Sequence, residues 1–226
     1  MEDPKKIEPD MAGLKRVIDI TRKYSKMFSE SRENIKKIVA AQNPASYSLS
    51  KYGWYISEMI PLSDLVDIHQ LFEVGKIEEA DTKMADHYRE NYVQIIRRII
   101  SRHKDRKSII EESSQAHKSQ MYFASTILFI SQADGICDGT IFVRADKKLS
   151  TIVKEQTPDI VYETLGKQSA IDEDTRITES SYYSELNRHN VMHGLKFDYG
   201  TELNSLKALS LLSFVANFTN RFKDQY

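Results

Sequence analysis

Glycine and proline, the residues that most often make tight turns, are scarce in this sequence. The 226 residues include 8 glycines and 5 prolines, whereas average protein composition is about 7% glycine and about 5% proline. Sandwiches, barrels and α/β domains with glycine-rich loops need frequent reversals of the chain. The shortage therefore favours an all-α fold of long helices, and the length fits a single domain over residues 1–226.

Cysteine is almost absent as well. The single cysteine, Cys137, excludes an internal disulfide and any site that needs several cysteine ligands for zinc or for an iron–sulfur cluster. We therefore interpret its thiol as structural. A lone cysteine is typical of a reducing compartment, and the first residues contain no apolar signal region. We expect a cytoplasmic protein.

Long hydrophobic runs and an excess of one charge are also missing. The most apolar stretch, residues 121–130, is much shorter than the roughly 20 residues that a membrane span needs. It predicts a buried helix, and no membrane partner is expected. The 32 basic and 33 acidic side chains give a net charge of −1. Such a chain does not coat nucleic acid as a polycation, so a polyanionic partner must bind a local patch.

Hydrophobic periodicity divides the chain into successive parts. Apolar residues three or four positions apart predict an N-terminal helix within residues 1–45 and long helices over 62–133. The aromatic residues of the connector, 47–61, are expected to pack inward. Residues 134–180 are acidic and poorly periodic, which predicts an irregular excursion that starts with a turn. Residues 181–222 regain helical spacing and predict a helix–loop–helix.

Capping and turn residues predict where the middle helices begin and end. Ser63 or Asp64 is expected to cap a helix that ends near Gly75. The chain after Gly75 is expected to form one or two long helices, with the break between two in the polar segment 103–106 and the second helix over 107–133.

The C-terminal part has its own start and stop signals. Ser180 or Ser181 is expected to cap a helix that runs through His193 and is closed by Gly194. The final helix is predicted to carry its apolar residues on one stripe. These residues are Leu203, Leu206, Leu211, Phe214, Val215, Phe218 and Phe222.

Cationic, imidazole and amide side chains gather in this helix–loop–helix. Arg188 supplies a fixed positive charge for a phosphate, while His189 and His193, four residues apart, share one helix face. Arg188 and His193 are five residues apart and do not share a face on a single helix. The candidate substrate-binding residues around them are Asn187, Asn190, Tyr199, Thr201, Asn204 and Lys207.

Structural and metal-binding interpretations of the same residues stay open. The spacing of Arg188 and His193 is not distinctive, because Arg98 and His103 have the same separation. Gly200 is explained equally well by an unusual backbone angle and Thr201 by a helix cap.

His189 and His193 also have the spacing of two metal ligands. Between them there is no Glu of the kind found in a zinc-protease helix, and no third ligand is evident, so no metal site is predicted.

The order of residues over 187–208 is more specific than any single spacing. An Arg, a polar residue, three further residues and a His are followed by Tyr-Gly-Thr-x-x-Asn-Ser-Leu-Lys-Ala. This order resembles the signature of the HEPN superfamily, and residues 53–56 and 131–136 show a vaguer likeness. The resemblance implies an all-α HEPN-like helical bundle. It also implies a metal-independent, cofactor-free endoribonuclease of the kind found in toxin–antitoxin and antiviral defence systems.

The resemblance further implies how the residues act. Arg188 and His193 of two subunits are expected to meet across the two-fold axis of a homodimer, which one helix alone cannot achieve. A His deprotonates a ribose 2′-hydroxyl, whose oxygen attacks phosphorus and leaves a cyclic phosphate, while Arg188 stabilises the developing charge. His189, at the polar second position of the motif, is expected to orient His193 or the phosphate.

One position departs from the family's pattern. Toxins modified by a nucleotidyltransferase partner often carry Tyr two residues after the His, where this chain has Leu195, so such control is doubtful although Tyr199 is close. The expected partners are RNA, a second copy of the chain, and an antitoxin or defence-system protein.

Two other functions stay open. One is a non-catalytic HEPN-like helical module that binds a partner protein or a nucleotide, and the other is a metal-dependent phosphohydrolase. A basic segment fits either RNA backbone binding or a solvated helix end. Its residues are Arg97, Arg98, Arg102, Lys104, Arg106 and Lys107.

Overall fold

The computed structural model describes Ala45, residues 48–137, Ile171 and residues 186–223, with side chains through Asn217. All of them belong to one compact unit of the chain, residues 42–226. This part is 76% helical and contains no strand, which confirms the predicted all-α fold class. The predicted N-terminal helix and nearly all of the excursion over 134–180 lie outside the described residues, so these two predictions and the single-domain prediction stay predictions.

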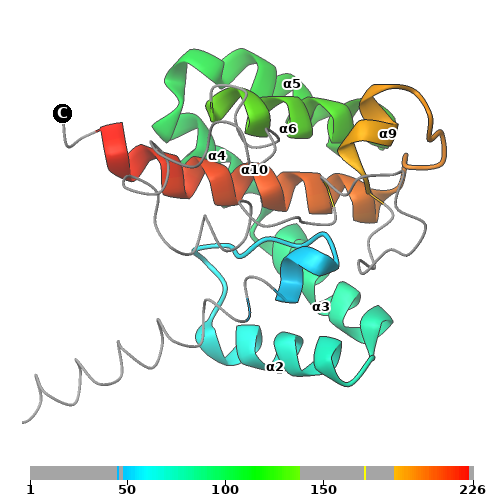
Figure 1. The fold of residues 1–226 in the computed structure, drawn as a ribbon. Coiled ribbons are helices and arrows are strands. Elements are labelled where there is room, and N and C mark those ends of the chain that lie inside the picture. The colour runs from blue at the N-terminus through cyan, green and yellow to red at the C-terminus, as the bar shows by residue number, and fades with distance from the viewer. Residues whose placement is uncertain (1–44, 46–47, 138–170, 172–185, 224–226) are drawn as a thin grey trace, which may run out of the picture. The chain divides into compact units, whose positions relative to one another are not determined.

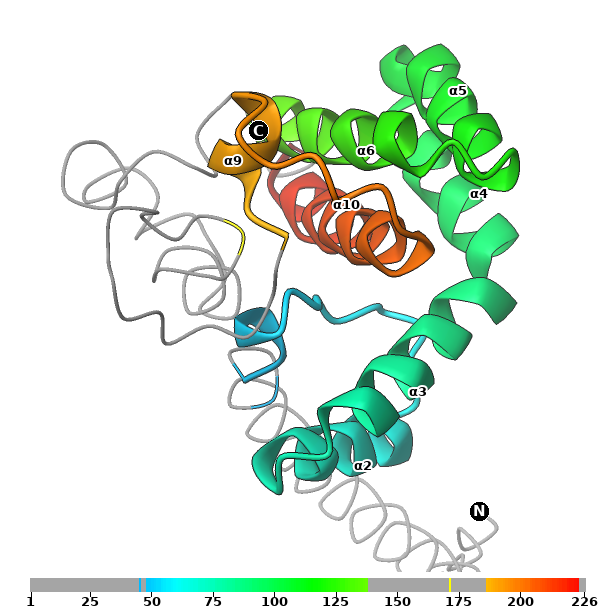
Figure 2. The same ribbon diagram turned by 90° about the vertical axis from the view of Figure 1, so that its right-hand side faces the viewer.

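The described chain folds into a set of helices around a central one (Figure 1). In chain order the helices are α2 (Leu62–Glu73), α3 (Ile77–Glu90), α4 (Tyr92–Arg102), the 3-10 helix η1 (Lys104–Arg106), α5 (Lys107–Lys118), α6 (Tyr122–Ile136), α9 (Arg188–Met192) and α10 (Glu202–Lys223). Figure 2 looks from the N-terminal end of α10, with α6 above it and with α4 and α3 beside it. The helix α10 therefore forms the middle of the core.

Helix α10 is buried on every side over residues 204–217, which corrects the predicted single apolar stripe. Its polar residues fit the core because their side chains are small or form hydrogen bonds. The hydroxyl of Ser210 donates to the carbonyl oxygen of Lys207 (2.6 Å) and accepts from the backbone N–H of Tyr55 (3.2 Å). A buried hydroxyl costs little when it is hydrogen-bonded in this way.

Helix α6 was predicted to be apolar and therefore buried all round, and this prediction is only partly right. Phe129 and Ile130 are buried, whereas Phe123 is 50% exposed. The hydrophobicity of α6 therefore did not predict that α6 is only partly buried, whereas the central helix α10 is buried on every side. Among the described residues, no helix combines the length and the hydrophobicity of a membrane span.

The long helices predicted over 62–133 are shorter and more numerous in the structure. The predicted break at 103–106 is confirmed by the end of α4 and by η1. A further break follows α3, where the side-chain amide of Asn91 donates to the carbonyl oxygen of His87 (2.9 Å) and competes with the helical backbone. Another break separates α5 from α6 at Gln120, which adopts a φ of +59°.

The predicted cap of α2 is wrong, whereas its end is right. The helix begins after Pro61, which makes no side-chain capping bond, and the hydroxyl of Ser63 donates to the neighbouring carboxylate of Asp64 (3.1 Å). Gly75 follows the helix with a φ of +76°, as a helix-terminating glycine does.

The predicted turn at 134–135 is part of α6 instead. Arg106 donates from Nη2 to the carbonyl oxygen of Gly135 (2.7 Å) and from Nη1 to Oε1 of Gln132 (2.9 Å). A Cβ atom at position 135 would lie 2.7 Å from Nη1 of Arg106. Glycine at this position therefore allows the arginine to approach the end of the helix, and it does not break the helix.

The connector before α2 packs inward, as predicted. Tyr52, Trp54 and Tyr55 are buried, and two hydrogen bonds join this segment to α3. The indole N–H of Trp54 donates to Asp81 (2.6 Å), and the hydroxyl of Tyr88 donates to the carbonyl oxygen of Tyr55 (2.8 Å). The connector is thus fixed against the helical core.

Candidate functional site

The helix that carries the predicted catalytic residues is short. It begins at Arg188, because Asn187 is extended and its side-chain oxygen accepts from the backbone N–H of Asn190 (3.1 Å). The expected cap at Ser180 or Ser181 is therefore wrong, although those serines themselves lie outside the described residues. The expected end is confirmed, since Gly194 has a φ of +68° directly after His193.

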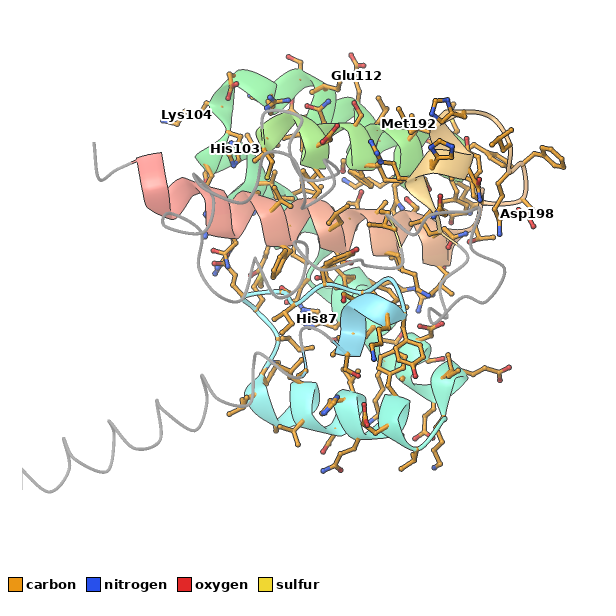
Figure 3. All side chains as sticks on the ribbon, viewed as in Figure 1. His87, His103, Lys104, Glu112, Met192 and Asp198 are labelled. Carbon is orange, nitrogen blue, oxygen red and sulfur yellow. The ribbon has the colours of Figure 1, made fainter. Side chains whose placement is uncertain are left out.

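His189 on α9 and His193 directly after it lie together on the surface. Both are exposed, and the centroids of their rings are 4.4 Å apart with the ring planes inclined by 57°. The shared face expected from four-residue spacing is thus confirmed. Figure 3 shows this end of the molecule, where the labelled Met192 lies on α9 and the labelled Asp198 lies in the loop beyond it.

Arg188 lies at the start of α9, which packs against α6. It is half-buried, and its charge acts on the carboxylate of Asp134 in the last turn of α6. Burial raises the pKa of Asp134, and the positive charge of Arg188 opposes this rise. The charge of Arg188 therefore acts on a carboxylate of α6 that the sequence did not indicate.

The loop from 194 to 200 is anchored to α9 through its backbone. The N–H groups of Leu195 and Lys196 both donate to the carbonyl oxygen of Asn190 (2.8 and 3.2 Å). Three apolar side chains nevertheless face solvent here, at 50% exposure for Met192, 62% for Leu195 and 82% for Phe197. We call these three residues the apolar patch, and it adjoins the histidine pair in the sequence.

Tyr199, Thr201 and Asn204, predicted to bind substrate, build the start of α10. The carbonyl oxygen of Tyr199 accepts from the N–H of Thr201 (2.8 Å) and from the side-chain amide of Asn204 (3.2 Å). Oγ1 of Thr201 accepts from the N–H of Asn204 (3.2 Å), which confirms Thr201 as the cap. Tyr199 and Asn204 are buried, each at 8% exposure. These residues support the loop and the start of α10, and their role as substrate ligands stays a prediction.

The expectation of an unusual backbone angle at Gly200 is wrong. Gly200 is not among the described glycines with positive φ. A Cβ atom there would instead overlap the ring of Phe123, which meets the ring of Tyr199 edge-on with centroids 5.0 Å apart. Glycine at position 200 therefore allows the ring of Phe123 to approach the backbone closely.

Lys207, also predicted to bind substrate, is buried in the core. Its Nζ atom lies 3.4 Å from the carboxylate of Asp81 and 5.5 Å from the centre of the Trp54 ring. The side chain is 6% exposed, so its charge serves the packing of α10 against α3. Its role in substrate binding stays a prediction.

The basic segment does not form one free positive surface. Arg98 and Arg102 both bind the carboxylate of Glu58, at 2.7 and 2.8 Å, and these ion pairs lower its pKa against the opposing effect of burial. Arg106 holds the end of α6, as described above. The segment therefore fits a solvated helix end better than a track for an RNA backbone.

A second polar cluster lies inside the bundle. The Nδ1 atom of His117 lies 2.8 Å from Oγ of Ser205, which lies 2.7 Å from Oγ of Ser125. Both serines are fully buried, so neither hydroxyl can meet a substrate. The sequence interpretation did not connect these residues, because they lie on three different helices.

No group of three or more His, Cys, Asp or Glu residues in the described chain is arranged to hold a metal ion. Comparisons of the chain with protein-family models, with curated proteins and with solved structures find no match. The HEPN resemblance therefore stays a prediction that rests on the residues quoted for it.

Two features of the site were missed from the sequence. Asp134 was read as part of a turn, and the only available signal was its place after a helical run. The apolar patch was overlooked, although Phe197 interrupts the polar residues that follow Gly194. Apolar residues inside a loop that follows a histidine pair are the signal that would have revealed it.

Proposed function

We propose that this protein is a metal-independent endoribonuclease of HEPN type that acts as a homodimer, as a toxin or an antiviral defence effector. The observation that carries the proposal is the exposed pair His189 and His193, with ring centroids 4.4 Å apart. His189 lies on the same short helix as Arg188, and His193 directly follows the last residue of that helix. Imidazoles titrate near neutral pH and can move protons without a metal. Arginine binds phosphate oxygens through fixed N–H groups.

In the proposed reaction, a neutral imidazole of His193 removes the proton of a ribose 2′-hydroxyl. The oxygen attacks the adjacent phosphorus, and the bond from phosphorus to the 5′-oxygen of the next nucleotide breaks. A protonated imidazole gives its proton to that leaving oxygen, so the products are a cyclic phosphate and a 5′-hydroxyl. Arg188 stabilises the charge on the phosphate oxygens, and His189 orients His193 or the phosphate.

The geometry of one chain favours a dimeric site. The attacking and leaving oxygens lie roughly in line on opposite sides of phosphorus, whereas His189 and His193 are in contact on one helix. A second copy related by a two-fold axis supplies the opposite side. The apolar patch beside the pair is the kind of surface that such a contact covers.

Cleavage of single-stranded RNA by purified protein in the presence of a chelator tests the proposal. Arg188→Ala and His193→Ala are expected to lower the rate by about 100-fold or more, while Lys83→Ala, which removes an exposed charge on α3, leaves it unchanged. A wild-type rate of RNA cleavage in the Arg188→Ala/His193→Ala variant contradicts the proposal. Loss of activity in the chelator indicates a metal-dependent phosphohydrolase instead.

The apolar patch also favours a second candidate, a non-catalytic helical module that binds a partner protein through this surface. That function predicts no RNA turnover by the wild-type protein. It also predicts a complex with the partner that is lost when Phe197, 82% exposed, is replaced by Ser. RNA turnover by low concentrations of wild-type protein, lost in His193→Ala, excludes it.

A further inference from the structure

His189 and His193 are joined by a single turn of helix. The backbone N–H of His193 donates to the carbonyl oxygen of His189 (3.0 Å), which is the hydrogen bond that places residues four apart above one another. The turn is capped at its start, where the side-chain oxygen of Asn187 accepts from the N–H of Asn190, and Gly194 ends it with a φ of +68°. The backbone therefore keeps the two imidazoles on one side of the chain.

Both imidazole rings are open to a ligand. The two side chains are exposed, and each ring contacts the other. Within the part of the chain that the structure describes, neither ring forms a hydrogen bond or an ion pair. A neutral imidazole has one nitrogen with a free lone pair, which is the atom that binds a metal ion.

The separation of the rings suits one shared metal ion. A metal that lies 2.0–2.1 Å from a ring nitrogen lies about 3.2 Å from the centroid of that ring. When the two metal–nitrogen bonds form a right angle, the centroids are about 4.5 Å apart, and at the tetrahedral angle they are about 5.2 Å apart. The observed separation is 4.4 Å. It matches the right angle, which Ni²⁺ and Cu²⁺ prefer between neighbouring ligands.

We infer that His189 and His193 form a two-imidazole binding site for a divalent transition metal of the Ni²⁺ and Cu²⁺ type, with water as the other ligands. Once one ring has bound the ion, the second ring meets it at a high effective concentration, which raises the affinity above that of a single histidine. Mg²⁺ and Ca²⁺ bind oxygen ligands, which this pair does not offer. A third protein ligand is needed for a structural or catalytic zinc and not for an ion that only occupies the imidazoles.

The consequence of this site for activity is inhibition, and this consequence alone rests on the proposed function. A bound metal takes the lone pair that His193 needs in order to remove the proton of the ribose 2′-hydroxyl. Metal binding therefore stops RNA cleavage, and a chelator raises the rate of protein that has bound metal. A metal-dependent phosphohydrolase responds to the chelator in the opposite direction.

Calorimetric titration of the untagged full chain with Ni²⁺ at neutral pH tests the site. His189→Gln and His193→Gln are each expected to weaken the tightest Ni²⁺ binding by about 100-fold or more, because each leaves a single imidazole. The matched control is His69→Gln, which replaces a half-buried histidine of α2 and is expected to leave the affinity unchanged. The inference is overturned if the wild-type protein binds no Ni²⁺, or if either site variant keeps the wild-type affinity.

RNA cleavage with and without Ni²⁺ separates this inference from the proposed function. If the wild-type protein does not cleave RNA, the proposed function fails, yet the calorimetric comparison still decides whether the histidine pair binds metal. If it cleaves RNA, saturating Ni²⁺ is expected to lower the rate by about 100-fold or more, and excess chelator to restore it. An unchanged rate at saturating Ni²⁺ overturns the inhibitory role of the site.

Discussion

The Nδ1 atom of His117 lies 2.8 Å from the hydroxyl oxygen of Ser205, where α5 meets α10. The same hydroxyl lies 2.7 Å from that of Ser125 on α6, and the imidazole stacks on the ring of Tyr92 from α4 with centroids 4.8 Å apart. One histidine thus contacts three other helices of the bundle. Its protonation state therefore affects the packing of all four.

We predict that the protein loses stability as the pH falls below about 6.5 and that His117 contributes to this loss. Burial lowers the pKa of His117 below 6.5; Glu202 opposes the shift, and Arg89 and Lys118 add to it. Because the unfolded chain binds the proton at a higher pH than the folded chain, stability is full above pH 6.5 and declines toward the lower folded pKa. Urea unfolding from pH 5 to pH 8 measures the decline.

The control variants for this prediction come from the same chain. His117→Gln is expected to reduce the dependence of unfolding free energy on pH, and His87→Gln to reduce it further, since burial also lowers the pKa of His87. His189→Gln replaces an exposed histidine and is expected to leave the profile unchanged. An unaltered profile in the His117→Gln/His87→Gln variant contradicts the prediction.

The stability of the fold also depends on Asp81, which binds both Lys207 and Trp54 in the core. We predict that Asp81→Asn destabilises the fold by about 3–5 kcal/mol, because it removes the carboxylate charge that lies 3.4 Å from the buried ammonium group of Lys207. Lys207→Met removes the buried charge itself and is expected to cost less. Chemical unfolding of both variants tests the order, and a larger loss in Lys207→Met contradicts it.

Gly200 and Gly75 are glycines for two different reasons, which are a close contact with a ring and a positive φ. Gly200→Ala is expected to cost about 1–3 kcal/mol, because the new methyl group meets the ring of Phe123. Gly75→Ala meets no atom within 4 Å but is strained at a φ of +76°, which costs about 1–2 kcal/mol. Adding Phe123→Leu is expected to recover stability in Gly200→Ala and not in Gly75→Ala. Equal recovery in both variants indicates that the ring contact is not the cause.

Local signals predicted the helical class and several helix ends correctly. The scarcity of turn residues, the polar break at 103–106, Gly194 and Thr201 all act within a few residues along the chain, so the sequence alone reveals them. The failures involve contacts between distant segments. Arg106 keeps Gly135 in a helix, and no pattern near position 135 reports an arginine that lies 29 residues earlier.

The candidate site shows the same division. The contact between the rings of His189 and His193 follows from their four-residue spacing, and the structure confirms it. The position of Lys207 depends on Asp81, 126 residues away in the chain, and the charge that acts on Asp134 comes from α9, which packs on α6. Spacing can therefore nominate site residues, whereas tertiary packing decides which of them stay at the surface.

The apolar patch gives a prediction about assembly. In the proposed homodimer, a second copy covers the exposed apolar side chains of Met192, Leu195 and Phe197, and their burial is expected to stabilise the dimer. Leu195→Ser/Phe197→Ser is therefore expected to weaken self-association by about 100-fold or more, in sedimentation measured across protein concentration. The loop backbone stays anchored to Asn190 through main-chain bonds, so the fold is expected to persist.

RNA cleavage by the Leu195→Ser/Phe197→Ser variant then tests whether the catalytic site depends on dimer formation. If the two Arg188 and His193 sets act together, the specific activity of Leu195→Ser/Phe197→Ser falls at low protein concentration and recovers at high concentration, in step with the dimer fraction. Val74→Ser is the matched control, because Val74 is 69% exposed and follows α2. Full activity in a variant that sediments only as a monomer contradicts a composite site, since a single helix then suffices for the reaction.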